Sequence, residues 1–546
     1  MSKQQQETSF PVETSLKKYL SAHPKPANLN FTYGTAGFRM KATNLDYVNF
    51  TVGILAALRS KFLGSKTIGV MVTASHNPPE DNGVKVVDPL GSMLESSWEA
   101  YATTLANSRH EELPANITKL AEELGIDFET PANVIIARDS RESSPALSDA
   151  TIDGFKSIPN TKFHDYGLFT TPQLHYLTRT LNDPAYGEPS EKGYYAKMAA
   201  AFKSIYKLTG KNQKIDITID AANGVGAPKA EDLFKEYLSE EISYTLVNGD
   251  YKTPNLLNFD CGADYVKTNQ RLPKNVDNPV ANKLYASFDG DADRLIAYYQ
   301  EPTKKEFRLL DGDKMSTLIA LFFQQLFQNI DEKKLNLNVG VVQTAYANGS
   351  STKYVEDVLK LPVRCTPTGV KHLHHEAEKF DVGVYFEANG HGTVIFSPKA
   401  ETKLFGYSLE GSSDKEVEAV KILQEFTKLI NQTVGDAISD LLAILIIIHY
   451  LDLTPEDWNK SYNDLPNKLT KVIVPDRTIF KTTNAERTLV EPAGLQAKID
   501  ELVKKYPSGR SFVRASGTED AVRVYAEAES KEDTAELSAL VGELVK

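Results

Sequence analysis

A strand-loop-helix pattern recurs along the chain and constrains its fold more than any other feature. Each copy is a run of β-branched residues, then a loop containing Gly or Asn, then an amphipathic helix. The copies lie at 133–143, 214–238, 338–360 and 363–380. Strands that alternate with helices in this way form β-α-β units, whose parallel or mixed sheets are covered by helices on both faces. The sequence therefore predicts the α/β fold class.

The C-terminal part of the chain, from about residue 455, follows a different pattern. It combines apolar strands at 471–480 and 510–529 with helices at 494–506 and 531–546, which predicts a smaller α+β domain. Because 546 residues far exceed a single hydrophobic core, several domains are expected. We expect three related α/β domains with mixed sheets and the smaller domain. The expected bounds are 1–205, 206–305, 306–454 and 455–546.

Charge and cysteine content exclude several classes of function. The 61 basic and 73 acidic residues give a net charge of -12, which argues against nucleic acid or an anionic membrane as the main partner. Cys261 and Cys365 are far apart and form no C-x-x-C motif, so neither a zinc site nor a disulfide framework is indicated. A reducing compartment fits this pattern best.

Apolar stretches give no sign of secretion or membrane insertion. The first residues contain no apolar signal-peptide core, so a cytoplasmic location is expected. The most apolar stretch, at 438–451, is shorter than the roughly 20 residues that a bilayer needs. We expect a buried core helix there.

Three aspartates at 289, 291 and 293 give the strongest chemical signal. Carboxylates so close repel one another unless a cation neutralises them, which favours a hard divalent ion. An EF-hand is the obvious rival, but Arg294 stands at position 6, where Gly is needed, and Gln300 at position 12, where Glu is needed. The flanking segments also resemble strands instead of helices. Three protein oxygens suit Mg²⁺ and leave places for water and one phosphate oxygen.

The segment RASGTEDAVRV at 514–524 has the composition of a phosphate clamp. Arg514 and Arg523 flank Ser516, Gly517 and Thr518, which together offer guanidinium donors, two hydroxyls and backbone N–H groups made accessible by Gly. A hairpin turn with incidental arginines explains this segment equally well when it is taken alone.

Two loops of the third domain are candidates for sugar contacts. Glu387, Asn389 and His391 lie in a Gly-rich loop after a strand, and offer donors and acceptors suited to hydroxyl groups. In the TPTGVK loop, Thr368, Gly369 and Lys371 could touch a ligand. The histidines that follow this loop do not have a metal-binding spacing, and we interpret them as ordinary positions at a helix start. They are His372, His374 and His375.

The N-terminal third contains two further candidate loops. FTYGTAGFR at 31–39 includes Arg39, and a Gly turn before a helix is an equally good interpretation. TASHNPPEDNG at 73–83 places Ser75 and His76 just after a predicted strand at 67–72, in what we expect to be a turn-rich loop. For an isolated Ser-His pair, a role in the turn is the commoner outcome. DAANGVGAP at 220–228 is interpreted as a turn from strand to helix.

Taken in order, these motifs resemble the α-D-phosphohexomutase superfamily. The motifs are G-T-A-G-F-R, T-A-S-H-N-P, D-G-D-A-D-R, E-A-N-G-H and R-A-S-G-T-E, and the resemblance covers nearly the whole chain. E-A-N-G-H stands in place of the E-x-S-G-H of the glucose and mannose mutases. Together with TPTGVKHLHHEA, it is similar to the branch acting on N-acetylglucosamine phosphates.

The resemblance implies an isomerase that interconverts N-acetylglucosamine 6-phosphate and N-acetylglucosamine 1-phosphate in UDP-N-acetylglucosamine synthesis. The reaction would pass through a phosphoserine and a sugar 1,6-bisphosphate, which also serves as activator. A phosphoglucomutase or phosphomannomutase is the close alternative, and a non-catalytic sugar-phosphate-binding relative is a second. A serine hydrolase is set aside because Ser75 is not in G-x-S-x-G and no orienting acid is identifiable.

The resemblance also assigns roles to residues. Ser75 would carry the phosphoryl group and, with Asp289, Asp291 and Asp293, would hold one Mg²⁺ per chain. Arg294 would lie beside them as a catalytic residue. Phosphoryl transfer needs positioning and charge neutralisation more than covalent help, which suits this division. His76 and Lys85 are candidates for proton transfer or phosphate support. The substrate contacts implied are Arg39, Thr368, Gly369, Lys371, Glu387, Asn389, Gly390, His391, Arg514, Ser516, Gly517, Thr518 and Arg523.

The four domains, in order, would then carry the phosphoserine loop, the metal loop, the sugar loop and the phosphate clamp. Because the sugar must present both ends to the serine, a cleft between domains and a mobile fourth domain are expected. The expected partner is a small sugar phosphate, without nucleic acid or membrane, and the chain is expected to be a monomer or weak homodimer.

Overall fold

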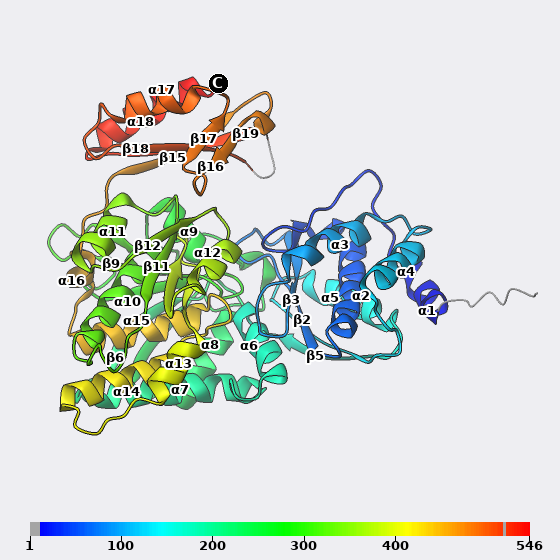
Figure 1. Ribbon diagram of the computed structural model, residues 1–546, viewed down its shortest axis with the longest axis horizontal. Helices are drawn as coiled ribbons and strands as arrows, with labels where there is room; N and C mark the ends of the chain where they lie inside the picture. The colour runs from blue at the N-terminus through cyan, green and yellow to red at the C-terminus, as the bar shows by residue number, and fades with distance from the viewer. Residues whose placement is uncertain (1–10, 517–519) are drawn as a thin grey trace, which may run out of the picture.

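The computed structural model of the chain describes residues 11–516 and 520–546. A central body carries the second and third domains, the first domain extends from it at the right, and the fourth sits above it (Figure 1). The predicted α/β class with a smaller C-terminal α+β domain is confirmed.

The first domain is a five-stranded mixed sheet with the strand order β1-β3-β2-β4-β5. Alternate residues of β2 face opposite sides: Val70 packs in the core shared with α2 and α5, whereas Met71 packs with residues of α6. The sheet is therefore covered on both faces, as predicted. Its strands are β1 (Phe38–Lys41), β2 (Thr67–Val72), β3 (Asp81–Val87), β4 (Ala132–Arg138) and β5 (Thr161–Leu168). Its helices are α1 (Pro11–Leu20), α2 (Asp46–Phe62), α3 (Ser96–Asn107), α4 (Leu113–Leu124), α5 (Ser144–Lys156) and α6 (Thr171–Asn182).

One local prediction in this domain is wrong. Asp81, Asn82 and Gly83 were expected in a turn-rich loop, but they begin β3 and pair with β1, with Arg39 opposite Gly83. A Cβ on Gly83 would lie 2.5 Å from the Phe38 carbonyl oxygen and 2.6 Å from that of Thr73. The glycine is therefore needed for close strand packing instead of for a turn.

The second domain has a five-stranded sheet with the order β10-β9-β8-β6-β7. The segment at 220–228 joins β6 to α8, which confirms its interpretation as a strand-to-helix turn. The expected boundary at 305 falls between β9 and β10 of this one sheet. The strands are β6 (Ile215–Asp220), β7 (Ile242–Val247), β8 (Tyr285–Phe288), β9 (Leu295–Gln300) and β10 (Phe307–Leu310). The helices are α7 (Glu191–Leu208), α8 (Gly226–Asp232) and α9 (Ala263–Asn269).

The third domain has a four-stranded sheet with the order β12-β11-β13-β14. The apolar stretch at 438–451 forms α15 and is buried except at its last residues, so the predicted core helix is confirmed. The strands are β11 (Val339–Thr344), β12 (Val363–Thr366), β13 (Val382–Phe386) and β14 (Gly392–Phe396). The helices are α10 (Gly312–Phe327), α11 (Gly349–Lys353), α12 (Val370–Ala377), α13 (Pro398–Phe405), α14 (Asp414–Leu429), α15 (Ala437–Leu451) and α16 (Pro455–Asn459).

The fourth domain packs two helices against a three-stranded antiparallel sheet, β15-β19-β18, and adds a separate hairpin of β16 and β17. Arg514 and Arg523 of the predicted phosphate clamp lie on β18 and β19, where they pair with each other. The strands are β15 (Asn467–Ile473), β16 (Lys481–Thr483), β17 (Thr488–Glu491), β18 (Arg510–Ala515) and β19 (Ala521–Glu527). The helices are α17 (Leu495–Val503) and α18 (Lys531–Leu544).

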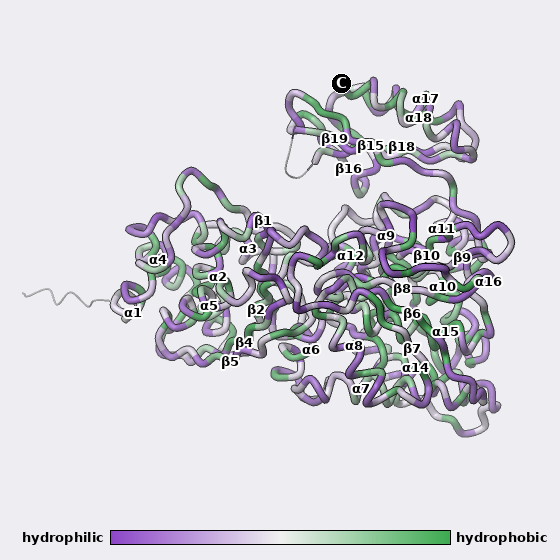
Figure 2. Tube along the Cα trace, turned by 180° about the vertical axis from the view of Figure 1, so that it is seen from behind, coloured by the Kyte–Doolittle hydropathy of each residue, from purple (hydrophilic) through white to green (hydrophobic). Residues whose placement is uncertain are grey.

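One hydrophobic core runs through both the second and third domains, and includes residues of α7, both sheets and α15. Figure 2 shows the apolar segments of this body along β6, β8 and α15. Most apolar residues of the first and fourth domains form cores of their own, but Tyr176 of α6 belongs to the shared core, and Phe512 and Tyr525 of the fourth domain pack against Ala345 of the third. Among the residues described, no helix combines the length and apolar character that crossing a bilayer requires.

Candidate active site

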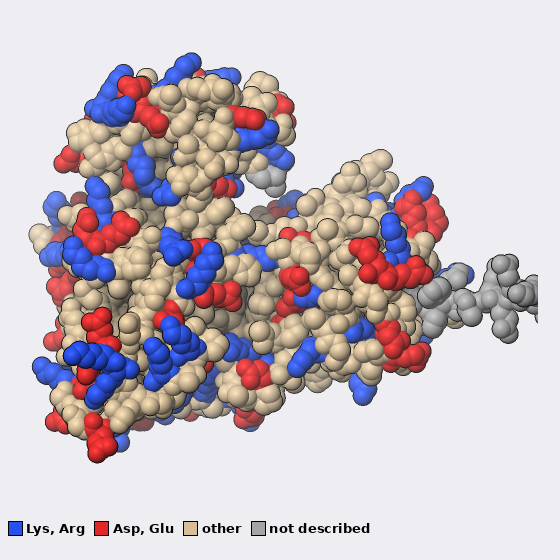
Figure 3. Space-filling model, in the orientation of Figure 1, with Lys and Arg blue, Asp and Glu red and all other residues tan. Residues whose placement is uncertain are grey.

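A cavity of about 300 Å³ lies where the four domains meet. Each domain contributes to its lining: Lys85 from the first, Arg294 from the second, His391 from the third and Arg514 from the fourth. Figure 3 shows the molecule hollowed between the fourth domain and the first. The predicted central cleft is thus present, and it brings together the loops identified in the sequence.

Ser75 lies in the loop that follows β2, behind the cavity-lining Asp293, and does not itself line the cavity. Its hydroxyl donates to Asp289 Oδ2 at 2.6 Å and is 3.3 Å from Asp293 Oδ1. Its φ of 53° lies in the left-handed region, which is uncommon for a residue with a Cβ, and the side chain is fully buried. A strained, buried serine aimed at carboxylates indicates a functional loop instead of an ordinary turn.

A buried ion pair that the sequence analysis missed holds this loop. Arg141 Nε contacts Asp139 Oδ2 at 2.9 Å, and both side chains are fully buried. The Arg141 guanidinium also donates to four loop carbonyls, those of Ser75, Asn77, Pro78 and Asp81. Arg141 lies in the 133–143 copy of the strand-loop-helix pattern, which by itself indicates only a loop after a strand. A single sequence does not show which distant carbonyls an arginine reaches.

Asp289, Asp291 and Asp293 each offer a carboxylate oxygen, and these oxygens lie within 4.8 Å of one another. Burial, and then the neighbouring aspartates, raise the pKa of Asp289 well above its usual range and raise that of Asp291. Oδ1 of Asp291 is buried and has no hydrogen-bond partner, although its Oδ2 accepts from Thr171 Oγ1 at 2.6 Å. An unpartnered carboxylate oxygen in a buried acidic cluster fits a divalent cation such as Mg²⁺.

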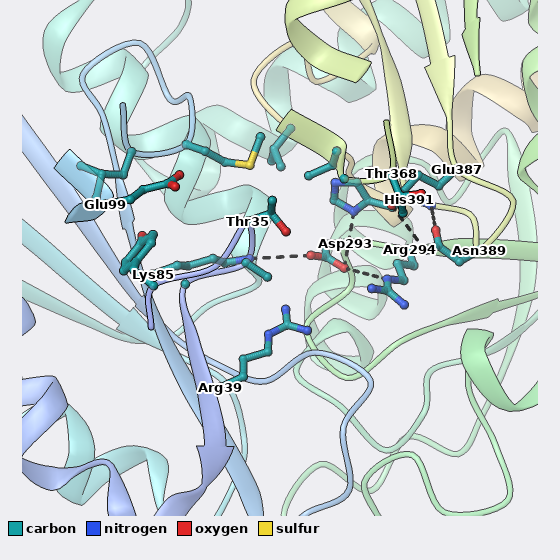
Figure 4. Close-up of a pocket in the computed structure, with 18 of the residues that line it drawn as sticks. Thr35, Arg39, Lys85, Glu99, Asp293, Arg294, Thr368, Glu387, Asn389 and His391 are labelled. Carbon is teal, nitrogen blue, oxygen red and sulfur yellow. Dashed lines mark hydrogen bonds and ion pairs between the residues drawn. The ribbon is translucent and has the colours of Figure 1, made fainter. Parts of the chain in front are cut away.

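Asp293 differs from the other two aspartates because cations surround it. Burial alone would raise its pKa, but His391, Lys85 and Arg294 together lower that pKa well below its usual range. Lys85 Nζ lies 3.7 Å from Asp293 Oδ2, and His391 Nδ1 lies 3.7 Å from Asp293 Oδ1 (Figure 4). Arg294 Nε lies 3.9 Å from the same oxygen and 3.8 Å from Asp289 Oδ2. Asp293 is therefore held ionised.

Two arginines line the cavity near the aspartates. Arg39 and Arg294 extend into the same space from β1 and from the start of β9 (Figure 4). The Nε atoms of both arginines are buried without a hydrogen-bond partner. Burial, and then the charge of Arg294, lower the pKa of Arg39. Two close cations with unused donors suit an anion such as phosphate.

The two candidates for proton transfer differ in position. Burial, and then the charges of Arg294 and Arg39, lower the pKa of His76 to about 3, so its imidazole is neutral at physiological pH. Its Nδ1 is buried without a partner. Lys85 lines the cavity from β3 and faces Asp293.

The sugar loop joins β13 to β14 and packs against the strand that follows the aspartates. Asn389 Nδ2 is 3.4 Å from Glu387 Oε2, and Asn389 Oδ1 accepts from the backbone N–H of His391 at 3.0 Å. Gly390, with a φ of 89°, accepts from the N–H of Leu295 through its carbonyl at 3.0 Å. Glu387, Asn389 and His391 line the cavity. A backbone hydrogen bond thus connects the sugar loop at 387–391 to Leu295, which follows the metal loop at 289–294.

The TPTGVK loop contributes only part of what was expected. Thr368 and Gly369 line the cavity. Lys371 instead donates to the Leu94 carbonyl at 2.5 Å and to Glu99 Oε1 at 2.6 Å, and lines a neighbouring cavity. In this structure Lys371 ties α12 to the first domain. The three histidines at 372, 374 and 375 lie in α12, as expected.

The structure describes the predicted phosphate clamp at 514–524 except for residues 517–519. Arg514, at the end of β18, lines the cavity and pairs in register with Arg523 of β19. The Ser516 backbone N–H donates to the Ala521 carbonyl at 2.8 Å. Gly517 and Thr518 lie outside the described residues.

His175 is a cavity residue that sequence reasoning missed. It lies within α6, where its Nδ1 is 2.7 Å from the Gly91 carbonyl oxygen, so that Nδ1 is the donor. Its Nε2 is buried without a partner. Burial, and then the charge of Lys85, lower the pKa of His175 to about 3, which leaves Nε2 as a neutral acceptor. No spacing within the helix marks this position in the sequence.

Comparison with protein families covers most of the chain. The model described as phosphoacetylglucosamine mutase AMG1, domain II, matches residues 186–296, and that of domain III matches 311–453. The phosphoglucomutase/phosphomannomutase C-terminal domain matches 469–543, and the alpha/beta/alpha domain I of that family matches 42–113 and 109–188.

Individual relatives agree with these matches. The phosphoacetylglucosamine mutase of Candida albicans is 70% identical, over 98% of this chain and 100% of its own length. The human phosphoacetylglucosamine mutase is 49% identical, over 96% and 95% of the two chains. Residue identity at this level over nearly whole chains shows common family membership.

Solved structures share the fold. An N-acetylglucosamine-phosphate mutase in its substrate complex has a TM-score of 0.95 and 71% identity, covering 98% of this chain and 100% of the other. The N-acetylphosphoglucosamine mutase of Aspergillus fumigatus, in complex with GlcNAc-6P and magnesium, has a TM-score of 0.92 and 49% identity, covering 98% of each chain.

Proposed function

This chain belongs to the phosphoacetylglucosamine mutase family of the α-D-phosphohexomutase superfamily, and on that premise we propose how its residues act. It is an isomerase that interconverts N-acetylglucosamine 6-phosphate and N-acetylglucosamine 1-phosphate, in the synthesis of UDP-N-acetylglucosamine. One observation carries the residue assignments: the Ser75 hydroxyl lies 2.6 Å from a carboxylate of the buried aspartate cluster.

Ser75 is proposed as the residue that carries the phosphoryl group. Its P–O bond breaks as a sugar hydroxyl oxygen forms the new bond to phosphorus, which gives the 1,6-bisphosphate and free serine. After the sugar turns, the Ser75 oxygen takes the other phosphate and the product is released. In-line positioning dominates the barrier to such transfers, so the tight hold on this loop by Arg141 supports the assignment.

Asp289, Asp291 and Asp293 are proposed to hold one Mg²⁺. When bound, it would neutralise charge on the transferring phosphoryl group. The unpartnered oxygen of Asp291 supports this role. Magnesium occurs in one solved structure of the Aspergillus fumigatus mutase and glucose 1,6-bisphosphate in another. We therefore also propose a sugar 1,6-bisphosphate as activator.

Each turnover also needs a proton to leave the attacking hydroxyl and a proton to reach the departing serine oxygen. We propose Lys85 and His76 for these transfers, since both belong to the serine loop or the strand that follows it. His76 Nδ1 is buried without a partner, which supports its candidacy as the acceptor, although burial and the charges of Arg294 and Arg39 lower its pKa to about 3 and make it a weak base. Lys85, beside the ionised Asp293, is the candidate donor.

The remaining contacts are proposed from position in the cleft. Arg39 and Arg294 would receive the reacting phosphate, and Glu387, Asn389, Gly390 and His391 would read the sugar in both orientations. Arg514, Arg523, Ser516, Gly517 and Thr518 would hold the phosphate that does not react, and Thr368 and Gly369 would lie nearby. Unused buried donors on Arg39 and Arg294, and the lining of one cavity by Arg514, support this arrangement.

The wider setting is proposed from the sequence. We propose a cytosolic enzyme, monomeric or weakly dimeric, that binds small sugar phosphates and neither nucleic acid nor membrane. We propose that the serine loop, the metal loop, the sugar loop and the clamp belong to four successive domains, with the second domain extended to include α7 and β10, which pack with or complete its sheet.

Phosphosite mapping of the purified protein tests the central assignment. The protein is incubated with N-acetylglucosamine 6-phosphate and Mg²⁺ while phosphorus NMR follows the product. A phosphate on Ser75 that exchanges with substrate as the 1-phosphate appears is the expected result. Turnover of glucose phosphate alone would move the chain to a sister branch. No phosphate on Ser75 and no turnover, even with added sugar bisphosphate, would overturn the proposal.

A further inference from the structure

The hairpin of β16 and β17 extends from the fourth domain and has an unusual tip. Asn484, Ala485 and Glu486 follow one another with φ values of 53°, 55° and 66°, all in the left-handed region. Residues with a Cβ rarely adopt this conformation singly, and a run of three needs support from outside the hairpin. The tip therefore indicates a constraint beyond the turn itself.

Glu486 supplies that external contact, and it joins two cavity-lining residues from different domains. Its Oε2 accepts hydrogen bonds from the backbone N–H of Thr368 at 3.0 Å and from the Thr368 hydroxyl at 2.6 Å. Its Oε1 lies 3.5 Å from Nε of Arg514. Thr368 belongs to the third domain and Arg514 to the fourth, and both line the central cavity.

The donors gathered around Glu486 are those that a phosphate would use. A backbone N–H, a hydroxyl and a guanidinium form the usual set for a tetrahedral anion, and a carboxylate can occupy the same positions with two oxygens. The side chain of Glu486 is about four-fifths buried in this position, with 20% of its surface exposed. Its charge also lies where it would repel an arriving phosphate.

We propose that Glu486 is a latch that holds the fourth domain against the third in the substrate-free enzyme and competes with the non-reacting phosphate for Arg514. Substrate binding displaces the carboxylate, and product release lets it return. The proposal rests on the proposed role of Arg514 as a phosphate ligand.

Other contacts between these two domains do not involve Glu486, among them the packing of Phe512 and Tyr525 against Ala345 and Tyr346. Arg510 donates to the carbonyls of Ala345 and Ala347 at 2.8 and 2.6 Å, and pairs with Glu527 at 2.9 Å. Glu527 accepts from the Gly349 N–H at 3.2 Å. The fourth domain can therefore pivot at Arg510 while Glu486 releases Thr368.

Replacement of Glu486 by Gln tests the latch, because Gln keeps the size and an oxygen for Thr368 but removes the charge. Calorimetric titration with N-acetylglucosamine 6-phosphate is expected to give about tenfold tighter binding than in the wild type. In steady-state assays the KM should fall by a similar factor while kcat stays equal or drops, because product leaves more slowly. Glu486→Asp, which keeps the charge, should bind close to the wild-type affinity.

Glu491→Gln is the matched control. Glu491 lies on the same hairpin, where it pairs with Lys481 at 2.9 Å, so its replacement removes one charge without touching Arg514. Its binding constant should equal that of the wild type. N-acetylglucosamine without phosphate is a second control and should bind all variants equally.

Unchanged or weaker binding of the sugar phosphate to folded Glu486→Gln would overturn the latch, and so would an equal gain in affinity for the unphosphorylated sugar. Arg514→Ala separates this outcome from failure of the clamp assignment. If Arg514→Ala binds the sugar phosphate as tightly as the wild type, the clamp assignment fails. If Arg514→Ala binds weakly while Glu486→Gln is unchanged, the latch alone fails.

Discussion

The guanidinium of Arg141 donates to the carbonyl oxygen of Ser75 across 2.9 Å, although 66 residues separate the two in the sequence. The same group reaches the carbonyl of Asn77 at 2.9 Å, and Asp139 neutralises its charge. A planar guanidinium offers five donors in fixed directions, which a loop of several carbonyls can match. Arg141 therefore fixes the backbone of the loop that carries Ser75.

Arg141→Lys should slow the reaction without weakening substrate binding. An ammonium keeps the charge beside Asp139 but cannot serve four carbonyls, so Ser75 loses its alignment. We expect kcat to fall by about 10- to 100-fold while KM changes by less than about threefold. Steady-state kinetics and the rate of Ser75 phosphorylation by glucose 1,6-bisphosphate measure both effects.

Arg138→Lys is the control for this change. Arg138 is the last residue of β4, just before the loop that contains Arg141, and pairs with Asp165 at 3.0 Å on a partly exposed surface. Its kinetics should match those of the wild type. An Arg141→Lys enzyme with wild-type kcat would contradict the role assigned to the loop contact.

Asp291→Asn should stabilise the metal-free protein while it abolishes activity. Three buried carboxylates repel one another, and removal of one charge relieves this repulsion. We expect the unfolding free energy in EDTA to rise by about 1–2 kcal/mol and kcat to fall by about a thousandfold or more. Thermal unfolding with and without Mg²⁺ measures the first effect.

In the same experiment, Mg²⁺ should raise the unfolding temperature of the wild type and leave that of Asp291→Asn nearly unchanged. Equal stabilisation of both proteins by Mg²⁺ would place the ion elsewhere.

Gly390→Ala should disrupt the sugar loop. A Cβ at this position would lie 1.9 Å from the Leu295 carbonyl oxygen, and the φ of 89° also disfavours it. We expect kcat/KM to fall by about 100-fold or more, because the loop can no longer join the strand after the aspartates.

Gly411→Ala is the control that distinguishes the steric clash with Leu295 from the strain of a positive φ. Gly411 has a similar φ of 74°, but its Cβ would have nothing within 4 Å. This variant should lose some stability and keep its kcat/KM. If both alanine variants behave alike, contact with Leu295 is not the cause.

Asp440→Asn should flatten the dependence of stability on pH. Burial, and then the carboxylate of Asp436, raise the pKa of Asp440 well above its usual range, and both of its oxygens lack partners. The folded protein thus keeps a proton that the unfolded chain releases above about pH 4. Wild-type stability therefore falls as pH rises from there toward the folded pKa.

An Asn at 440 has the shape of the protonated acid and does not titrate. Chemical unfolding at several pH values should give equal stabilities near pH 4 and a more stable variant at pH 8. A difference between the two proteins that stays constant with pH would exclude titration of Asp440 as the cause.

Features contained within one short segment were predictable from the sequence. The aspartates at 289, 291 and 293 repel one another whatever the fold, so their spacing alone indicated a cation. The strand β2 and the helix α15 could also be predicted from one short segment each, because a β-branched run favours a buried strand and a long apolar run favours a buried helix.

What the sequence could not indicate depends on contacts between distant segments. Arg141, Thr171 and His175 acquire their roles only where other domains or loops meet them. Asp81 to Gly83 looked like a turn because their residue types favour turns, yet pairing with β1 overrides that preference. Lys371 lies in a loop whose sequence suggested ligand contact, but its ammonium group pairs with Glu99.

The hydrophobic core shared by the second and third domains gives the enzyme a fixed frame of reference. The aspartates and the sugar loop both belong to that body, so an intermediate that turns end over end meets the same electrostatic surroundings twice. Most apolar residues of the first and fourth domains lie outside this shared core, so a movement of either domain need not change the spacing of the aspartates and the sugar loop. Whichever end of the sugar phosphate faces Ser75, the aspartates and the sugar loop would then keep the same positions relative to each other.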